Sequence, residues 1–319
     1  LTQTMHAVHA QRFRSPKMVQ LFDRFATYNG STPYQAPGTL AMIPHLEFGF
    51  GTFVPYGGMV AITESLVALA ERQGVQFHYG QPVERIHVNG RRATGLLVGG
   101  TELSADIVVS NMDVTPTYRR LLPDLKAPEK TLSQERSSSA LIFYWGVRRE
   151  FPELDLHNIL FANDYEAEFR DLFEHKTLHG DPTVYIHITS KDLEGEAPVG
   201  GENWFVMINA PADYGQDWGS WRATARASVL AKIERALGID VAPFIEVEEV
   251  LDPPTIQSRT GSDRGALYGA SSNNAMAAFV RHPNFHRQIP NLFFVGGSAH
   301  PGGGIPLCLL SAKIAADLG

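Results

Sequence analysis

The stretch that decides the fold is Pro290–Gly319, which reads PNLFFVGGSAHPGGGIPLCLLSAKIAADLG. It opens with an apolar run, Leu292–Val295, and passes through a glycine-rich turn, Gly296–Gly304. It ends in Ile305–Leu318, where apolar residues recur at helical spacing. Strand, glycine turn and helix in this order present backbone N–H groups to an anionic ligand in α/β proteins. The pattern is equally compatible with a buried strand and helix joined by a flexible loop.

Composition bounds the class of protein. The 319 residues allow one large or two ordinary domains, and a hydrophobic content of 44% is normal for a globular core. A net charge of −7 argues against non-specific nucleic-acid binding. The single cysteine, Cys308, excludes an intrachain disulfide and suits a reducing cytoplasm. No apolar run approaches the roughly twenty residues that span a bilayer.

The N-terminal part of the chain combines helical and aromatic patterns. Leu1–Tyr28 is predicted to be helical, and Asn29–Gly38 is a loop marked by glycine and proline. Phe48, Phe50 and Phe53 then alternate as in a strand. Such a cluster is typical of a core or of the lining of an apolar ligand tunnel, and both interpretations stay open.

A helix and several strands are predicted next. Gly57–Gly58 precedes a helix over Met59–Arg72, and Asn89–Gly90 is a strong hairpin turn. Ala105–Ser110 is predicted to be a continuous buried strand. The other strands predicted here are Val75–Tyr79, Pro82–Val88 and Ala93–Val98.

After Asn111 the pattern changes to strands with few crossover helices. The predicted strands are Ser137–Val147, Asn158–Ala162, Thr183–Thr189, Trp204–Ala210 and Ile245–Val250. A long helix is predicted over Trp218–Leu237, with an inner face of Ala223, Ala227, Leu230, Ile233 and Leu237. This block favours an antiparallel sheet, inserted between Asn111 and the last strand.

Three stretches resemble one family in the right order. Val295–Lys313, VGGSAHPGGGIPLCLLSAK, is similar to the C-terminal flavin-binding signature of the bacterial phytoene desaturases, the FAD-dependent carotenoid desaturases. Phe53–Met59 resembles the family's second flavin-contacting segment. Val83–Ile86, with Ala93–Gly95 and Ala105–Asn111, resembles its strands beside the adenine. The resemblance implies an α/β fold, α+β overall: a two-dinucleotide-binding FAD domain, here incomplete, plus a substrate domain with a mostly antiparallel sheet and helices.

One part of the family pattern is absent. The chain contains no G-x-G-x-x-G motif, and the nearest approach, Gly49–Val54, ends in valine and does not open a helix. We therefore expect a C-terminal fragment that lacks the first βαβ unit and binds FAD weakly or not at all. The expected division is 1–54 and 118–282 for the substrate domain, with 55–117 and 283–319 for the FAD domain.

The resemblance also implies cofactor-binding residues. Gly57, Gly58 and Met59 would lie near the isoalloxazine, and Val83 would pair its backbone with the adenine. The C-terminal turn supplies the rest, with Gly296, Gly297 and Ser298 beside the pyrophosphate and ribitol, and Gly303, Gly304, Ile305 and Pro306 at the flavin ring.

The implied activity is removal of two hydrogens from adjacent carbons of a carotenoid, either phytoene-type or hydroxylated, in carotenoid biosynthesis. A polyene substrate, peripheral contact with the inner membrane from the cytoplasm, and a possible homodimer follow. Other interpretations are an amine-oxidase-like flavoprotein, a retinol saturase-like enzyme and a non-enzymatic lipid-binding fragment. No catalytic residue is assigned.

Two other patterns carry little weight. His175 and His179 have the spacing of helical metal ligands, but Lys176 stands where a zincin requires Glu, so no metal site is predicted. Ser298 and His300 miss the G-x-S-x-G motif and are interpreted as residues of the turn.

Overall fold

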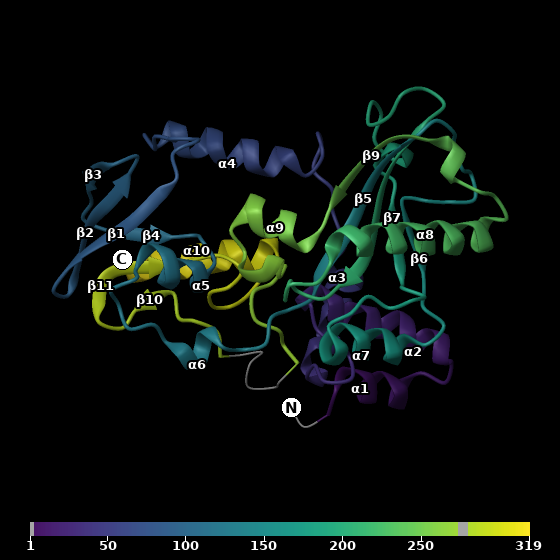
Figure 1. Cartoon of the computed structure of the whole chain (residues 1–319), viewed down its shortest axis with the longest axis horizontal. Coiled ribbons are helices and arrows are strands. Elements are labelled where there is room, and N and C mark those ends of the chain that lie inside the picture. The colour runs from purple at the N-terminus through teal and green to yellow at the C-terminus, as the bar shows by residue number, and fades with distance from the viewer. Residues whose placement is uncertain (1–2, 274–279) are drawn as a thin grey trace.

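The computed structural model describes residues 3–273 and 280–319. Figure 1 shows a five-stranded sheet with its helices on one side of the molecule, and two three-stranded sheets on the other. The predicted mixture of helices and mainly antiparallel strands is confirmed.

The five-stranded sheet is antiparallel throughout, in the order β6-β7-β8-β5-β9. Its strands are β5 (Ser139–Val147), β6 (His157–Leu160), β7 (Val184–His187), β8 (Glu202–Ala210) and β9 (Ile245–Leu251). All five coincide with predicted strands to within a few residues. Because successive side chains of a strand point to opposite faces, this sheet has one face in the core and one face away from it.

Helix α8 (Trp218–Leu237) covers the core face of this sheet. It occupies the predicted range, begins at an Asp217 cap that accepts from the backbone N–H of Ser220, and ends at left-handed Gly238. The predicted inner face is confirmed for Leu230, Ile233 and Leu237, which pack in the core, and is wrong for Ala223 and Ala227. The side chains that the helix buries against the sheet are those of Trp218, Ala225, Val229 and Ile233, whereas Ala223 and Ala227 are exposed.

Short helices form the N-terminal part, as predicted. They are α1 (Met5–Arg12), α2 (Pro16–Asp23) and the 3-10 segment η1 (Arg24–Asn29). The chain breaks between α1 and α2 because Pro16 begins a new helix at its first position. Left-handed Gly30 ends η1, and the predicted loop follows up to η2 (Gly38–Ala41). Leu1 lies outside the described residues.

The two smaller sheets bring distant segments together. One is the meander β1 (Val83–Asn89), β2 (Arg92–Val98) and β3 (Thr101–Ser104). The other has the order β10-β11-β4, from Phe285–His286, Ile289–Phe294 and Val108–Ser110. β11 pairs with β4 in parallel, so the chain between them is an insertion, as predicted.

Helix α10 (Ile305–Leu318) follows β11 over the predicted range. It buries Ser311 and Ala315, while Leu309, Ala312 and Ala316 are exposed. The remaining helical segments are α5 (Val114–Pro116), η3 (Thr117–Leu121), α6 (Glu129–Leu132), α7 (Tyr165–Arg170), η4 (Asp171–His175), η5 (Thr189–Lys191), η6 (Ala242–Phe244), α9 (Pro253–Thr260) and η7 (Asp263–Gly265).

Three local predictions are wrong. Phe48 and Phe50 lie in a helix, α3 (Met42–Phe50), and the alternation with Phe53 reflects no strand. Val75–Tyr79 forms no strand, because no other described segment supplies a partner ladder. Ala105–Ser110 is strand only over its last residues, β4, where β11 pairs with it, and Val109 is half exposed.

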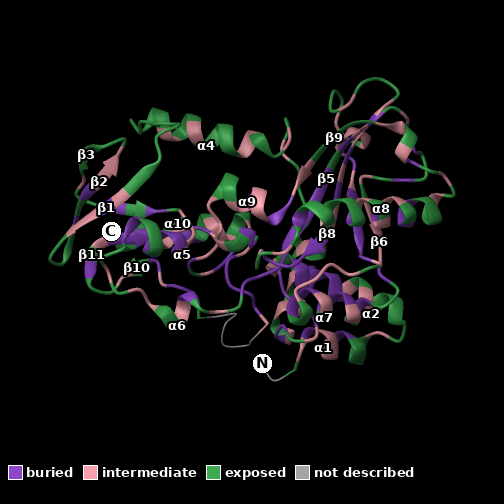
Figure 2. Cartoon of the chain, in the orientation of Figure 1, coloured by how far each residue is buried: buried purple, intermediate pink, exposed green. Residues whose placement is uncertain are grey.

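Helix α4 (Val60–Arg72) follows the Gly57–Gly58 turn, as predicted, but buries none of its residues. Figure 2 shows it and the loop before it exposed over most of their length. Among the described residues, no helix is both long enough and apolar enough to cross a membrane.

Candidate functional site

The glycine turn leaves β11 at the edge of the parallel pair. The backbone N–H of Val295 donates to the Ser110 carbonyl at 3.0 Å, which extends the ladder by one residue. Gly296 then has φ +97°, and a Cβ there would lie 2.6 Å from Oδ1 of Asn111. Only glycine fits this position without displacing Asn111. At the start of the turn the backbone itself therefore forms the surface, because Gly296 has no side chain to cover it.

The side chain of Asn284 joins the two ends of the turn. Its buried side-chain amide donates to the Phe294 carbonyl at 3.1 Å and the His300 carbonyl at 2.8 Å. It also reaches Oγ of Ser311 in α10 at 2.8 Å. One side chain thus fixes the strand, the turn and the helix relative to one another.

Ser298 faces the start of α5. Its Oγ accepts the backbone N–H of Val114 at 3.0 Å, which leaves the hydroxyl hydrogen available for a further acceptor. On its other side, a Cβ at Gly269 would lie 2.8 Å from Cα of Ser298. The turn is therefore clamped between the start of α5 and the segment around residue 269.

Two larger side chains close the far half of the turn. A Cβ at Gly302 would lie 2.9 Å from Nε of Arg281, and a Cβ at Gly303 would lie 2.7 Å from Cδ1 of Tyr268. Both glycines are buried, so these contacts leave the backbone as the surface of the turn. Arg281 supports it further, since its Nη1 donates to the Tyr268 carbonyl at 2.8 Å.

The turn ends at the N-terminus of α10. Gly304 has φ +101° and a Cβ there would meet nothing within 4 Å, so this point is open. In the described part of the chain no side chain caps the helix, its first turn contains no acidic residue, and Ile305 and Pro306 are exposed. Free N–H groups and the helix dipole make such an end favourable for an anion.

Arg281 is a buried cation beside this turn. It is 7% exposed, and its Nε has no hydrogen-bond partner within the described residues. Burial, with the neighbouring charge of Arg136, lowers the pKa of Arg281 to about 10. Arg136 is paired with Asp263 at 2.9 Å, whereas no such ion pair is found for Arg281 among the described residues. Buried charges are ordinarily compensated, so the turn has an unused donor next to it.

The other residues assigned from the sequence lie apart from the turn. Gly57 and Gly58 have φ +84° and +76°, and the backbone N–H of Gly58 donates to the Pro55 carbonyl at 3.0 Å. A Cβ at Gly58 would meet nothing within 4 Å. Met59, before α4, is exposed, and Val83 begins β1 opposite Val98. In the view of Figure 1 the ribbons of α4 and α10 lie apart.

No metal site accompanies the turn. Nδ1 atoms of His175 and His179 hydrogen-bond the two oxygens of Asp171 at 2.9 and 2.7 Å, which explains their spacing. Within residues 3–273 and 280–319, no cluster of His, Cys, Asp and Glu can hold a metal ion. Cys308 lies in α10, and burial raises the pKa of its thiol, as expected for a structural cysteine.

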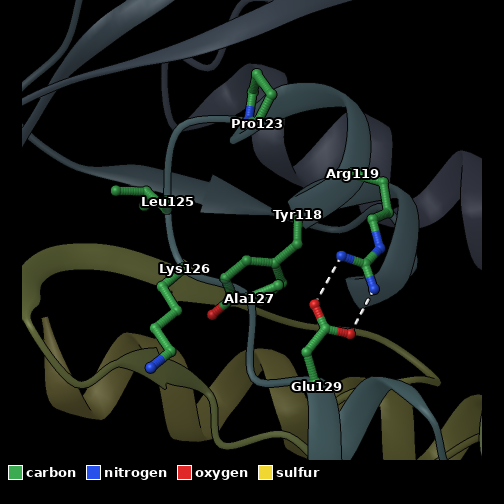
Figure 3. Close-up of a pocket in the computed structure, with 7 residues that line it drawn as sticks. All are labelled: Tyr118, Arg119, Pro123, Leu125, Lys126, Ala127 and Glu129. Atoms are coloured by element: carbon green, nitrogen blue, oxygen red, sulfur yellow. Dashed lines mark hydrogen bonds and ion pairs between the residues drawn. The ribbon is translucent and has the colours of Figure 1, made fainter.

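A separate cavity of about 320 Å³ is lined by residues of the segment from Tyr118 to Glu129 (Figure 3). Tyr118 lines it and stacks on Phe294 with ring centroids 5.5 Å apart. At its rim, Arg119 and Glu129 form two hydrogen bonds of 2.8 and 2.6 Å. Arg119 and Glu129 at the rim therefore satisfy each other, whereas the Lys126 side chain also lines the cavity.

Sequence reasoning missed the residues that shape the turn. Asn284, Arg281 and Tyr268 precede β11 in a stretch without helix or strand periodicity, so no pattern marks them as buried. The one usable signal is the polar run around Arg281–Asn284 immediately before a strongly apolar strand.

Comparison with known proteins bears on this geometry. The sequence model of the family described as flavin containing amine oxidoreductase matches residues 3–318. The chain belongs to this family. Among solved structures, an oxidoreductase from Methanosarcina mazei has a TM-score of 0.63 at 15% identity, covering 98% of this chain and 68% of that one. Cyclohexylamine oxidase from Brevibacterium oxydans has a TM-score of 0.52 at 15% identity, covering 99% and 68%. At these identities the likeness shows the fold alone.

Curated relatives are more similar in sequence. The chain is 59% identical over 308 residues to 1-hydroxycarotenoid 3,4-desaturase of Flavobacterium sp. (strain P99-3), covering 97% of this chain and 63% of that protein. It is 34% identical to 4,4'-diaponeurosporene oxygenase of Staphylococcus aureus, covering 98% and 64%, and 30% identical to phytoene desaturase of Fusarium fujikuroi, covering 96% and 58%. The resemblance to carotenoid desaturases is confirmed, and the chain spans about three fifths of these relatives.

Proposed function

We propose that the full-length protein is an FAD-dependent desaturase of a carotenoid, phytoene-type or hydroxylated, acting in carotenoid biosynthesis. The observation that carries the proposal is the 59% identity, over 97% of this chain, to a protein named 1-hydroxycarotenoid 3,4-desaturase. Membership of a flavin-containing family supports the cofactor class.

The glycine turn fits an anionic dinucleotide. Gly296 and Gly303 have no room for a side chain. Within the described residues, the first turn of α10 has no side-chain cap and Nε of buried Arg281 has no hydrogen-bond partner. Each of these features favours a phosphate or an electron-rich ring edge at the turn. Gly296, Gly297 and Ser298 would approach the pyrophosphate and ribitol, and the segment 303–306 would meet the ring. Gly57–Met59 and Val83 are proposed to complete the site in the full-length protein.

When bound, FAD would supply the acceptor for the hydride that leaves the carbon chain. The chain's own residues would bind and orient a polyene and exclude water. Such a ligand has few polar atoms, so its binding depends on apolar burial worth about 25 cal/mol per Å². No strongly basic side chain is required of the protein, and positioning accounts for the rate.

The proposal extends to cofactor retention by the 319 residues alone. A Cβ at Gly58, before α4, would meet nothing within 4 Å, and a Cβ at Gly57 would lie 3.7 Å from Cβ of Ala61. The sequence also lacks the G-x-G-x-x-G turn that usually cradles a pyrophosphate. Residues 1–319 would therefore retain FAD weakly or not at all. A stoichiometric flavin spectrum from this chain would contradict that expectation.

Two partners are proposed besides the substrate. The exposed aromatic side chains of Phe48, Phe50 and Phe53 support peripheral contact with the inner membrane, from a cytoplasmic location. The edge strand β3 exposes every residue, which supports pairing in a homodimer. Flotation with vesicles tests the first and light scattering of the full-length protein tests the second.

Three other functions compete. An amine-oxidase-like activity would act on cations, a retinol saturase-like activity would act on a related polyene, and a lipid-binding protein would hold no flavin. Flavin content of the full-length protein separates the last from the others. Turnover of amines against polyenes separates the first two.

The direct experiment is expression of the full-length protein in cells that accumulate phytoene or a hydroxylated carotenoid. Pigment analysis is expected to reveal a product with extended conjugation. Unchanged pigment in both hosts, with a flavin-loaded protein, contradicts the proposal.

A further inference from the structure

Arg24 is a buried cation at the start of η1. Its side chain is 8% exposed at the start of η1, its Nη1 donates to Oγ1 of Thr27, and its Nε has no hydrogen-bond partner within the described residues. It takes part in no ion pair with a carboxylate in the described part of the chain. A buried guanidinium is costly unless its donors are used.

The carboxylates around Arg24 are already engaged. Asp23 is 1% exposed and binds Nδ1 of His6 and of His9 at 2.6 and 2.8 Å. Glu168 is equally buried and accepts from Thr183 at 2.6 Å and from Asn209 at 3.1 Å. The spare donor of Arg24 is therefore not a missed ion pair with either of them.

A second unused polar group accompanies the arginine. The hydroxyl of Tyr165, in α7, is buried and has no partner among the described residues, and the side chain is 6% exposed. Desolvation raises the pKa of Tyr165 well above its ordinary value, and the charge of Arg24 opposes that rise, so the charge of Arg24 acts on this hydroxyl group. Two unsatisfied donors together indicate a place for an acceptor.

An aromatic surface lies on the face of the five-stranded sheet that looks away from α8. Tyr144 lies opposite Phe205 in the ladder, with ring centroids 5.5 Å apart. Tyr185 on β7 lies 6.2 Å from the Phe205 ring. Tyr144 is 41% exposed, so the surface is open to an apolar ligand. Burial raises the pKa of Tyr185 and the charge of Arg24 opposes that rise, so the arginine's charge acts at this surface.

The Tyr268 ring packs against both the glycine turn and the end of η1. A Cβ at Gly303 would lie 2.7 Å from Cδ1 of Tyr268, and a Cβ at Gly30 would lie 2.8 Å from its Cδ2. Gly30 directly ends η1, the segment that Arg24 begins. Tyr268 therefore lies between the turn proposed to hold the flavin and the segment that carries Arg24.

We propose that Arg24 binds the oxygen of a hydroxyl or carbonyl group at the end of the polyene. This rests on the proposed function and adds a residue that determines specificity, with Arg24 selecting for a carotenoid that has an oxygenated end. The hydrocarbon chain would lie along Tyr144, Phe205 and Tyr185, and the terminal oxygen would accept from Arg24. A site built around a donor rejects a ligand that leaves the donor unpaired.

The test compares two polyenes of equal length, one with a terminal hydroxyl group and one without, on the full-length protein. Arg24→Met is expected to lower kcat/KM for the hydroxylated polyene about tenfold to a hundredfold, chiefly through KM, as loss of a charged hydrogen bond does. The value for the hydrocarbon should change less than about threefold. Arg24→Lys should restore part of the preference. Arg259→Met, at an exposed pair with Glu249, is the matched control.

Equal losses for both polyenes, or no loss for either, overturn the inference. Binding followed by the absorption shift of each polyene separates this from failure of the proposed function. If neither polyene is desaturated, a preference of the wild type for the hydroxylated ligand that Arg24→Met abolishes still supports Arg24. Absence of that preference in the wild type contradicts it. If Arg24→Met does not fold, Arg24→Gln with the same two ligands gives the same comparison.

Discussion

The ring of Tyr268 occupies the space that a side chain at Gly303 would need. A Cβ at position 303 would lie 2.7 Å from Cδ1 and 3.0 Å from Cα of Tyr268. Because one of these atoms is backbone, a rotamer change alone cannot relieve the contact. The glycine turn keeps its shape only while this position has no side chain.

Gly303→Ala in the full-length protein is therefore expected to lose flavin and to destabilise the fold by about 1–3 kcal/mol, as overpacking does. Flavin absorbance per protein and the thermal midpoint measure the two effects. Gly180→Ala is the control, since a Cβ there would meet nothing within 4 Å. Full flavin content in Gly303→Ala would remove the turn from the cofactor site.

Two carboxylates, each bound by two histidines, offer a matched pair. Asp23 binds His6 and His9 at 1% exposure, whereas Asp171 binds His175 and His179 at 27% exposure. Asp23→Ala is expected to lower the unfolding free energy by about 3–5 kcal/mol, because it leaves the side chains of His6 and His9 without their hydrogen-bond partner. Asp171→Ala should cost less than about 1 kcal/mol. Chemical denaturation of both variants measures this, and equal losses would contradict the burial argument.

His282 predicts a pH dependence of stability. Its Nε2 lies 3.0 Å from the Tyr118 hydroxyl, and burial lowers the pKa of His282 from 6.5 to about 4. A lowered folded pKa gives stability that is complete above 6.5 and is lost as the pH falls toward 4. The loss would be about 3 kcal/mol.

His282→Gln should lack this dependence, so the difference in unfolding free energy between wild type and variant should shrink as the pH falls. Denaturant titrations at several pH values measure it. A difference that stays constant across this range would indicate that His282 titrates normally.

The sequence predicted the longer helices and the strands of the antiparallel sheet well. Helices α8 and α10 occupy their expected ranges, and the five strands of the antiparallel sheet were all anticipated. These segments carry their own periodicity and caps, such as Asp217 before α8 and Gly238 after it. Sequence alone suffices where the local pattern and the packing agree.

The failures arise where a partner decides the structure. Phe48 and Phe50 alternate like strand residues, yet no described strand is available to pair with them and they lie in α3. Of the site, the glycines could be predicted because the turn needs their backbone freedom. Asn284, Arg281 and Tyr268 could not, because their burial depends on contacts with residues far away in the chain.

The exposed aromatic residues of α3 and the following loop test the proposed membrane contact. Phe48, Phe50 and Phe53 are 72%, 73% and 85% exposed. Replacing all three by Ser is expected to reduce flotation of the full-length protein with vesicles and to leave the thermal midpoint nearly unchanged. Phe151→Ser is the opposite control, since that ring is fully buried and its loss should unfold the sheet. Undiminished flotation of the triple variant would contradict membrane contact through this segment.

The central claim is that this chain is part of a flavoprotein that oxidises a polyene. Its most direct test is anaerobic mixing of the flavin-loaded full-length protein with a hydroxylated carotenoid, followed by visible absorption and product analysis. The account predicts loss of the oxidised-flavin absorbance together with one new double bond in the carotenoid. Persistent oxidised flavin beside a bound, unchanged carotenoid would contradict it.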